Sequence, residues 1–147
     1  MKNLAQFTQL KCLYFEGNGC VSLTGLEENR ELRSLYVQEN CIDKIEGLEN
    51  MKELRVMNIS DNMLKKITGL KGCIILDTLH MKANRLGQLK EEDGGDLEAL
   101  KGLLECPTLS CLDIQANYLH DPAIVDEILC KLPNLKVLYT QGNNFCK

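Results

Sequence analysis

Apolar residues recur along this chain in one phrase, L-x-x-L-x-L-x-x-N, which occurs six times. The copies begin near residues 10, 32, 54, 76, 109 and 135. An asparagine closes each copy: Asn18, Asn40, Asn62, Asn84, Asn117 and Asn143. The first four asparagines stand 22 residues apart, and further apolar columns recur at repeat positions 11, 14, 17 and 20. A fixed period with this consensus predicts a leucine-rich-repeat solenoid.

The alternation within each phrase predicts one short strand per copy. Successive side chains of a strand point to opposite faces, so repeat position 4 should face the core and positions 3, 5 and 7 should face outward. Each strand is followed by a crossover to the same edge, which predicts a six-stranded parallel sheet on the concave side. We therefore predict an α/β, right-handed solenoid. Its short crossovers should be single turns or 3₁₀ pieces at first and become α-helical towards the C-terminus.

The spacing between the fourth and fifth asparagines is 33 residues, which indicates an insertion at about 87–105. Its acidic, glycine-bearing run at 91–96 lacks the alternating acids of a calcium loop and should be solvated. A helix is predicted to follow, with Asp96 as its N-cap. The pair Asp121-Pro122 predicts a second helix start. The buried sides of the two helices are predicted at Leu97, Leu100, Leu103 and Leu104, and at Ile124, Val125, Ile128 and Leu129.

The chain reads as one leucine-rich-repeat domain spanning 1–147. Leu4 and Phe7 occupy columns 17 and 20, as if they were the tail of a preceding repeat. Few residues follow the last asparagine. Because solenoids need polar caps at both ends, we expect this sequence to be a fragment that lacks full caps.

Charge and composition narrow the partner classes. The net charge is −4 with interspersed signs, which gives no basic surface for nucleic acid. No window is long and apolar enough for a membrane span, and the first ten residues contain no secretory signal. We expect a cytoplasmic chain that is monomeric by itself and binds neither nucleic acid nor membrane.

The chain contains eight cysteines, a number that is compatible with disulfides or a metal site, but their positions in the repeats argue against both. Cys20, Cys73 and Cys106 fall in core columns, where cysteine acts as a small hydrophobe. Cys12 and Cys111 belong to the first and fifth strands, which places them roughly 19 Å apart at ~4.8 Å per strand. No C-x-x-C pair is present for zinc. Reduced cysteines are expected, with no metal and no cofactor.

The outward columns supply the candidate binding residues. A concave surface of mixed polar and aromatic residues is what repeat proteins use to bind partners. Tyr14 and Tyr36 should be cross-strand neighbours, and tyrosine is a common anchor in protein interfaces. The asparagine column should instead satisfy backbone groups between repeats. The predicted protein-binding face comprises Tyr14, Glu16, Arg33, Tyr36, Gln38, Arg55, Asn58, His80, Lys82, Asp113, Gln115 and Tyr139.

One group of residues resembles a catalytic triad. His80 and Asp113 should be neighbours on adjacent strands, with Cys111 diagonal to the histidine. Diagonal side chains in a sheet lie about 7–8 Å apart, so a Cys–His hydrogen bond is not assured. No glycine-rich turn or helix N-terminus faces that point to form an oxyanion hole. We predict a partly exposed ion pair within a recognition surface, and no enzyme.

The 22-residue unit, seen at 32–48, resembles the repeat class named after the protein phosphatase 1 regulator. A narrower resemblance comes from the order of four segments. Together these segments resemble the repeat domain of the dynein axonemal assembly factor 1 family. They are the opening segment at 10–19, then Asn117-Tyr118-Leu119-His120-Asp121-Pro122, the segment at 132–138, and the closing pair Gly142-Asn143. Two positions depart from that pattern. Thr140 replaces an apolar residue in column 6, and Asn144 stands where the family usually has proline.

This resemblance implies a non-enzymatic scaffold for preassembly or docking of axonemal dynein arms in motile cilia or flagella. It implies a protein partner, either a dynein heavy chain or an assembly chaperone, and a location in the cytoplasm or the axoneme. Two alternatives stay open from the sequence. One is a regulatory subunit of a protein phosphatase 1 type enzyme, and the other is an outer-arm dynein light chain.

Overall fold

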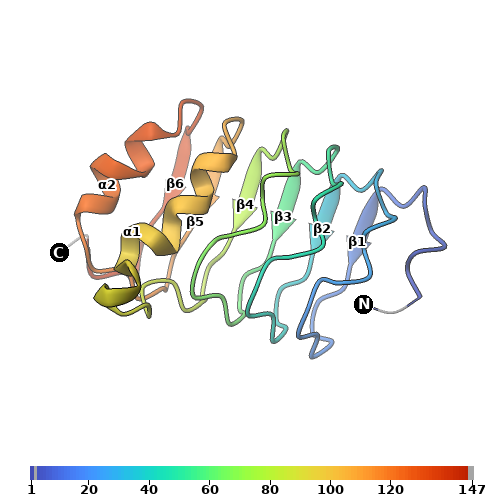
Figure 1. Ribbon diagram of the computed structural model, residues 1–147, viewed down its shortest axis with the longest axis horizontal. Helices are drawn as coiled ribbons and strands as arrows, with labels where there is room; N and C mark the ends of the chain where they lie inside the picture. Colours follow the sequence, from blue (N-terminus) through green and yellow to red (C-terminus); the bar gives the residue numbers. More distant parts are fainter. Residues whose placement is uncertain (2, 146–147) are drawn as a thin grey trace.

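The computed structural model describes Met1 and residues 3–145, and its strands stack in one row (Figure 1). Six three-residue strands form a single sheet in the order β1 to β6, and every neighbouring pair is parallel. The strands are β1 Cys12–Tyr14, β2 Ser34–Tyr36, β3 Val56–Asn58, β4 Thr78–His80, β5 Cys111–Asp113 and β6 Val137–Tyr139. The predicted six-stranded parallel sheet is confirmed.

The pairing register matches equal repeat positions on adjacent strands, as the 22-residue period predicts. Leu13 lies opposite Leu35, and Tyr14 lies opposite Tyr36. Position 4 is buried in the four inner strands, where its neighbours at positions 3 and 5 are half-buried. Equivalent apolar side chains therefore stack on one another, and the core runs the length of the molecule.

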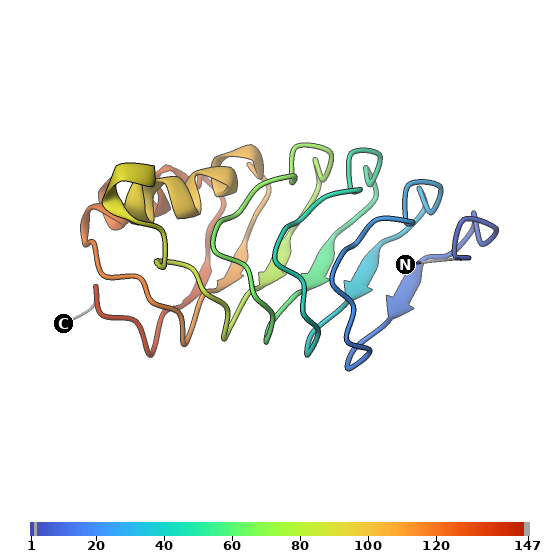
Figure 2. The same ribbon diagram turned by 60° about the horizontal axis from the view of Figure 1, so that its bottom comes forward.

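The crossovers change character along the chain. Between β1 and β4 they consist of turns and extended segments. The insertion then forms η1 Glu91–Asp93, α1 Gly95–Leu100 and η2 Lys101–Glu105, and the last crossover forms α2 Ala123–Glu127 and η3 Leu129–Lys131. These helices cover the side opposite the sheet near the C-terminal end, as Figure 2 shows. The predicted increase in helix towards the C-terminus is confirmed.

Details of the two helices differ from the sequence prediction. Asp96 is not an N-cap: it lies within the first turn of α1, and its buried Oδ2 accepts the backbone N–H groups of His120 and Asp121 at 2.6 and 2.8 Å. The second helix starts where Asp121-Pro122 predicts: Pro122 is the N-cap of α2, and Asp121 Oδ1 accepts the Ala123 N–H at 2.9 Å. Leu104 and Val125 were expected in the core but are exposed. Both lie on the outer side of their short helices.

Five asparagines join successive repeats through a shared pattern of hydrogen bonds. Asn62 is typical: its Oδ1 accepts the Ile42 N–H at 2.9 Å, and its Nδ2 donates to Val37 O, Ile59 O and Ser60 O. The side chain thus contacts both its own turn and the preceding repeat. Equivalent bonds are made by Asn40, Asn84, Asn117 and Asn143.

Asn18, the first of the column, is an exception. It is exposed, and its Nδ2 donates to Glu16 O within its own turn at 2.9 Å. A different buried asparagine acts nearby: Asn29 Nδ2 donates to Leu4 O and Phe7 O, both at 2.9 Å. Asn29 occupies column 20, where the other repeats carry apolar residues, and it fastens the N-terminal turn to the stack.

The cysteines within the described residues are free. Cys73 and Cys106 are buried in the core, and burial raises the pKa of each thiol to about 12. Cys20 is half-buried. The eighth cysteine, Cys146, lies outside the described residues.

Candidate protein-interaction face

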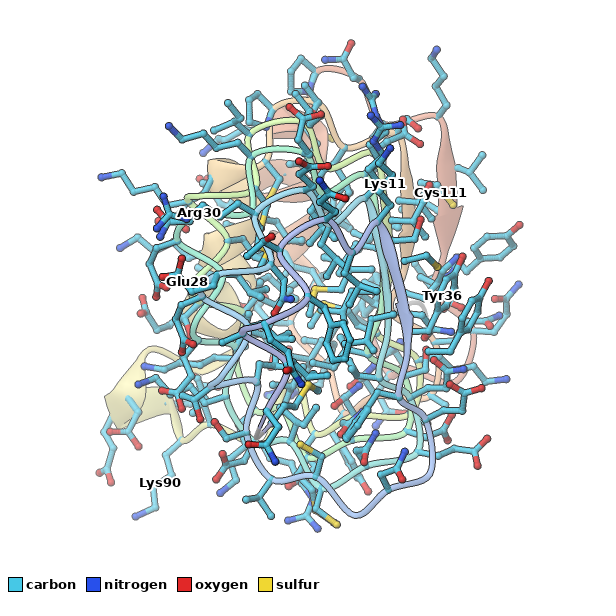
Figure 3. The ribbon with its side chains drawn as sticks, turned by 90° about the vertical axis from the view of Figure 1, so that its right-hand side faces the viewer. Lys11, Glu28, Arg30, Tyr36, Lys90 and Cys111 are labelled. Carbon is cyan, nitrogen blue, oxygen red and sulfur yellow. The ribbon has the colours of Figure 1, made fainter. Side chains whose placement is uncertain are left out.

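The outward side chains of β1 to β6, together with the residues that flank each strand, form one continuous surface, which we name the sheet face. Figure 3 looks along the stack and shows Tyr36 and Cys111 projecting from the sheet, with Glu28 and Arg30 on the opposite side of the molecule. Every residue predicted to bind a partner lies on the sheet face. Their outward placement follows from alternation along strands whose position 4 is anchored in the core.

The N-terminal end of the sheet face carries an aromatic pair. The rings of Tyr14 and Tyr36 stack with centroids 4.6 Å apart and an interplanar angle of 3°. Tyr14 is 66% exposed, whereas Tyr36 is half-buried beneath it. A hydrogen bond with Cys12 is the largest cause raising the pKa of Tyr14, so its hydroxyl is neutral near pH 7. The pair offers a rigid apolar face with polar tips.

Amides and ions occupy the middle of the sheet face. His80 Nδ1 and Asp113 Oδ2 are 3.8 Å apart, so the register correctly places the two side chains in contact, and the contact is an ion pair when the imidazole is protonated. Asn58 and Asp113 each also accept a backbone N–H two residues further along the chain. Gln115 Nε2 donates to Gln141 Oε1 in the next repeat, and both residues lie just beyond the ends of their strands. These side chains are oriented by local bonds and still leave polar groups facing outward.

Charged residues without an ion pair flank the strands. Glu16, Arg33, Arg55 and Lys82 are exposed and form no ion pair with another described residue. Tyr139, 42% exposed, ends the column on β6. The face therefore combines aromatic anchors with charges that are available to a partner, which is the composition of a protein-recognition surface.

The suspected triad is not assembled on this face. Cys111 lies opposite Thr78 in the register, whereas His80 lies opposite Asp113 and contacts it. Burial, followed by the charges of Asp77 and Asp113, raises the pKa of the Cys111 thiol. A raised pKa disfavours the thiolate that a nucleophile needs. The arrangement suits recognition and lacks the features of a cysteine nucleophile.

The described residues also bear on metal binding and membrane insertion. No group of three or more His, Cys, Asp or Glu side chains there could hold a metal ion. None of the helices found in Met1 and 3–145 is sufficiently long and apolar to cross a membrane.

Sequence comparison finds relatives over part of the chain. The leucine-rich repeat-containing protein ODA7 of Chlamydomonas reinhardtii is 49% identical over 47 residues, which are 32% of this chain and 11% of that protein. Homologs named dynein axonemal assembly factor 1 from Drosophila pseudoobscura pseudoobscura and Drosophila melanogaster are each 41% identical over 69 residues. That match covers 47% of this chain and 4% of each relative. No protein-family model matches the chain.

Structural comparison finds the same architecture in bacterial proteins. The functional domain of InlJ from Listeria monocytogenes aligns with a TM-score of 0.70 at 20% identity, over 97% of this chain and 27% of that one. The internalin InlF from the same species gives a TM-score of 0.71 at 20% identity, over 95% of this chain and 44% of that one. At this identity the likeness concerns the fold. The chain is a leucine-rich-repeat solenoid whose sequence homologues include proteins named dynein axonemal assembly factor 1 and ODA7.

Proposed function

We propose that this chain is a non-enzymatic scaffold that binds a protein partner through its sheet face during assembly of axonemal dynein arms. The observation that carries the proposal is the sequence match to proteins named as dynein axonemal assembly factors. The match covers a small part of each relative, so the partners and location are proposed here. The suggested partner is a dynein heavy chain or an assembly chaperone, met in the cytoplasm or at the axoneme.

The geometry supports binding in preference to catalysis. Tyr14 and Tyr36 form a preorganised aromatic pair, and Arg33 and Arg55 lie exposed immediately before β2 and β3. Tyrosine and arginine are the residues that most often dominate binding energy at protein interfaces. Because the two rings are already stacked, little side-chain freedom is lost when a partner covers them. We expect the binding energy to concentrate at this end of the sheet face.

The proposal is tested by co-purification from an extract of ciliated cells with a tagged chain. Wild-type protein should retain dynein heavy chains or assembly chaperones, and Tyr36→Ala or Arg55→Glu should abolish their retention. Tyr118→Ala and Lys52→Glu are matched controls, because both residues are exposed and lie away from the sheet face. Retention of every partner by Tyr36→Ala and Arg55→Glu would remove the sheet face from the account.

The same experiment separates the alternatives. A phosphatase catalytic subunit that co-purifies and is lost on the same two changes would indicate a phosphatase regulatory subunit. Recovery of the chain with assembled axonemes, and not with cytoplasmic chaperones, would instead indicate an axonemal light chain. An assembly factor predicts chaperones or unassembled heavy chains in the cytoplasmic fraction.

A further inference from the structure

A second surface lies along the row of turns that follow the strands, which Figure 2 shows at the lower edge of the molecule. A groove of about 640 Å³ runs across the second, third and fourth repeats at this edge. Its lining residues are Cys41, Asp43, Lys44, Met63, Lys65, Lys66, Thr68, Arg85 and Leu89. None of them belongs to the sheet face, so the groove is a separate feature of the molecule.

The repeat register explains why cations gather in this groove. Lys44 and Lys66 occupy repeat position 13 in successive repeats, and Lys65 precedes Lys66 at position 12. Arg85 occupies position 10 of the following repeat. Because equal positions stack along a solenoid, these residues, distant in the sequence, line one groove.

The charge of the groove opposes that of the whole chain, which has a net charge of −4. Four cationic side chains line it, against the single carboxylate of Asp43. Lys44 is compensated by Glu46, whose Oε2 lies 3.2 Å from its Nζ. Lys65, Lys66 and Arg85 have no ion pair with any residue between Met1 and Phe145 that the structure describes. A hollow lined by one sign of charge concentrates its field on a ligand of the opposite sign.

The floor of the groove is partly apolar. Met63, Thr68 and Leu89 are half-buried, whereas Lys65 and Lys66 are exposed. A site with an apolar floor and cationic side chains around it fits a chain that alternates acidic and apolar side chains. An extended peptide advances about 3.3 Å per residue and the repeats advance about 4.8 Å, so three or four residues would cross the groove.

We propose that this groove binds an extended acidic segment of a protein partner. Charge complementarity to the three unpaired cations supplies orientation, and the apolar floor accepts the intervening side chains. A nucleic acid fits less well, since no aromatic residue lines the groove to stack with a base. The net negative charge of the chain would also repel a long polyanion beyond the groove. The inference adds a second contact surface to the proposed scaffold and does not depend on the sheet face.

The test uses the 147-residue chain and a fluorescein-labelled decapeptide of alternating glutamate and leucine, followed by fluorescence anisotropy. Wild-type protein should bind this peptide and should bind the matched glutamine–leucine peptide at least tenfold more weakly. Raising the salt from about 50 to about 300 mM should weaken the interaction, because the screening length shortens. The double change Lys65→Glu/Lys66→Glu should raise the Kd at least tenfold.

The control variant is Lys52→Glu/Lys71→Glu, which changes the net charge equally at exposed lysines outside the groove. It should bind the acidic peptide within twofold of wild type, as should Tyr14→Ala/Tyr36→Ala on the sheet face. Circular dichroism spectra of all variants should match the wild-type spectrum. If Lys65→Glu/Lys66→Glu loses the acidic peptide but still co-purifies dynein components, groove binding is separate from the proposed function.

Three results would overturn the proposal. One is that the groove variant and the control variant weaken binding of the acidic peptide equally. Another is that wild-type protein binds the glutamate and glutamine peptides equally. The third is binding of a labelled oligothymidine through Lys65 and Lys66 with no binding of the acidic peptide at millimolar concentration, which would assign the groove to nucleic acid.

Discussion

The asparagine ladder makes a quantitative prediction at Asn62, one of its middle members. Asn62→Ala removes an acceptor from the Ile42 N–H and donors from the carbonyls of Val37, Ile59 and Ser60. All of these groups lie in the interior of the stack, where water does not easily replace the lost partner. The change therefore leaves one backbone N–H unsatisfied between two repeats and removes one donor from each of three carbonyls.

The expected cost follows from how many groups lose their last partner. Each of the three carbonyls keeps another donor, so their loss is limited to weakened bonding. The Ile42 N–H keeps none, and an orphaned buried donor costs about 1–3 kcal/mol. Adding about 1 kcal/mol for the net loss of the side-chain donors, we expect Asn62→Ala to lower the free energy of unfolding by about 3 kcal/mol. That is a large fraction of the roughly 5–15 kcal/mol typical of a domain.

Asn18→Ala is the matched control. Asn18 belongs to the same sequence column, but it is exposed and makes a single local bond, so its replacement should cost at most about 1 kcal/mol. The chain contains no tryptophan, so urea unfolding is best followed by far-ultraviolet circular dichroism. Equal losses for the two variants, within about 0.5 kcal/mol, would refute the reasoning, because such a difference lies at the level of surface substitutions.

Three further predictions concern a thiol, a histidine and a glycine. The raised pKa of Cys111 predicts slow labelling by a thiol reagent at pH 7, and a rate above that of free cysteine, measured by mass spectrometry, would contradict it. The charge of Asp96 is the largest cause raising the folded-state pKa of His120 above 6.5. The stability that protonated His120 gives the fold should therefore be fully present below pH 6.5 and be lost as pH rises through the folded-state pKa. Urea unfolding of wild type and His120→Gln should therefore converge as pH rises, and a constant difference would argue against this pairing. A Cβ at Gly102 would overlap the backbone carbonyl of Ile67, so Gly102→Ala should lower stability by about 2 kcal/mol, and unchanged thermal unfolding would disprove that packing.

Much of the fold could be predicted because residues 22 positions apart stack on one another in successive repeats. Once the asparagines fix the register, the pairing of Tyr14 with Tyr36 and of His80 with Asp113 follows from equal repeat positions. The stacking of the two rings and the 3.8 Å ion pair agree with that register. Whether the sheet face binds a partner remains a prediction.

Features that depend on a neighbouring crossover could not be predicted in the same way. Asp96 looked like a cap because it precedes a helical pattern, but its carboxylate reaches backbone amides 24 and 25 residues further along the chain. The outward orientation of Leu104 and Val125 depends on how η2 and α2 pack over the stack. The role of Asn29 could have been predicted from its place in an apolar column, since a buried polar side chain needs a hydrogen-bond partner.

The groove was also missed, although the register contained part of its signal. Lys44 and Lys66 share repeat position 13, which places them in adjacent turns. What the sequence could not supply is the contribution of Leu89, which comes from the start of the insertion and completes the lining. The insertion interrupts the 22-residue period, so Leu89 cannot be assigned a repeat position from which its neighbours could be predicted.

Photo-crosslinking is the sharpest test of the contact that we propose between the sheet face and a partner in dynein assembly. A photoreactive benzoylphenylalanine placed at Tyr36, and separately at Tyr118 as the off-face control, is activated in an extract of ciliated cells. We expect crosslinks from position 36 to a dynein heavy chain or an assembly chaperone, identified by mass spectrometry, and none to these proteins from position 118. Crosslinks to dynein components from position 118 alone, or none to them from position 36, would contradict it.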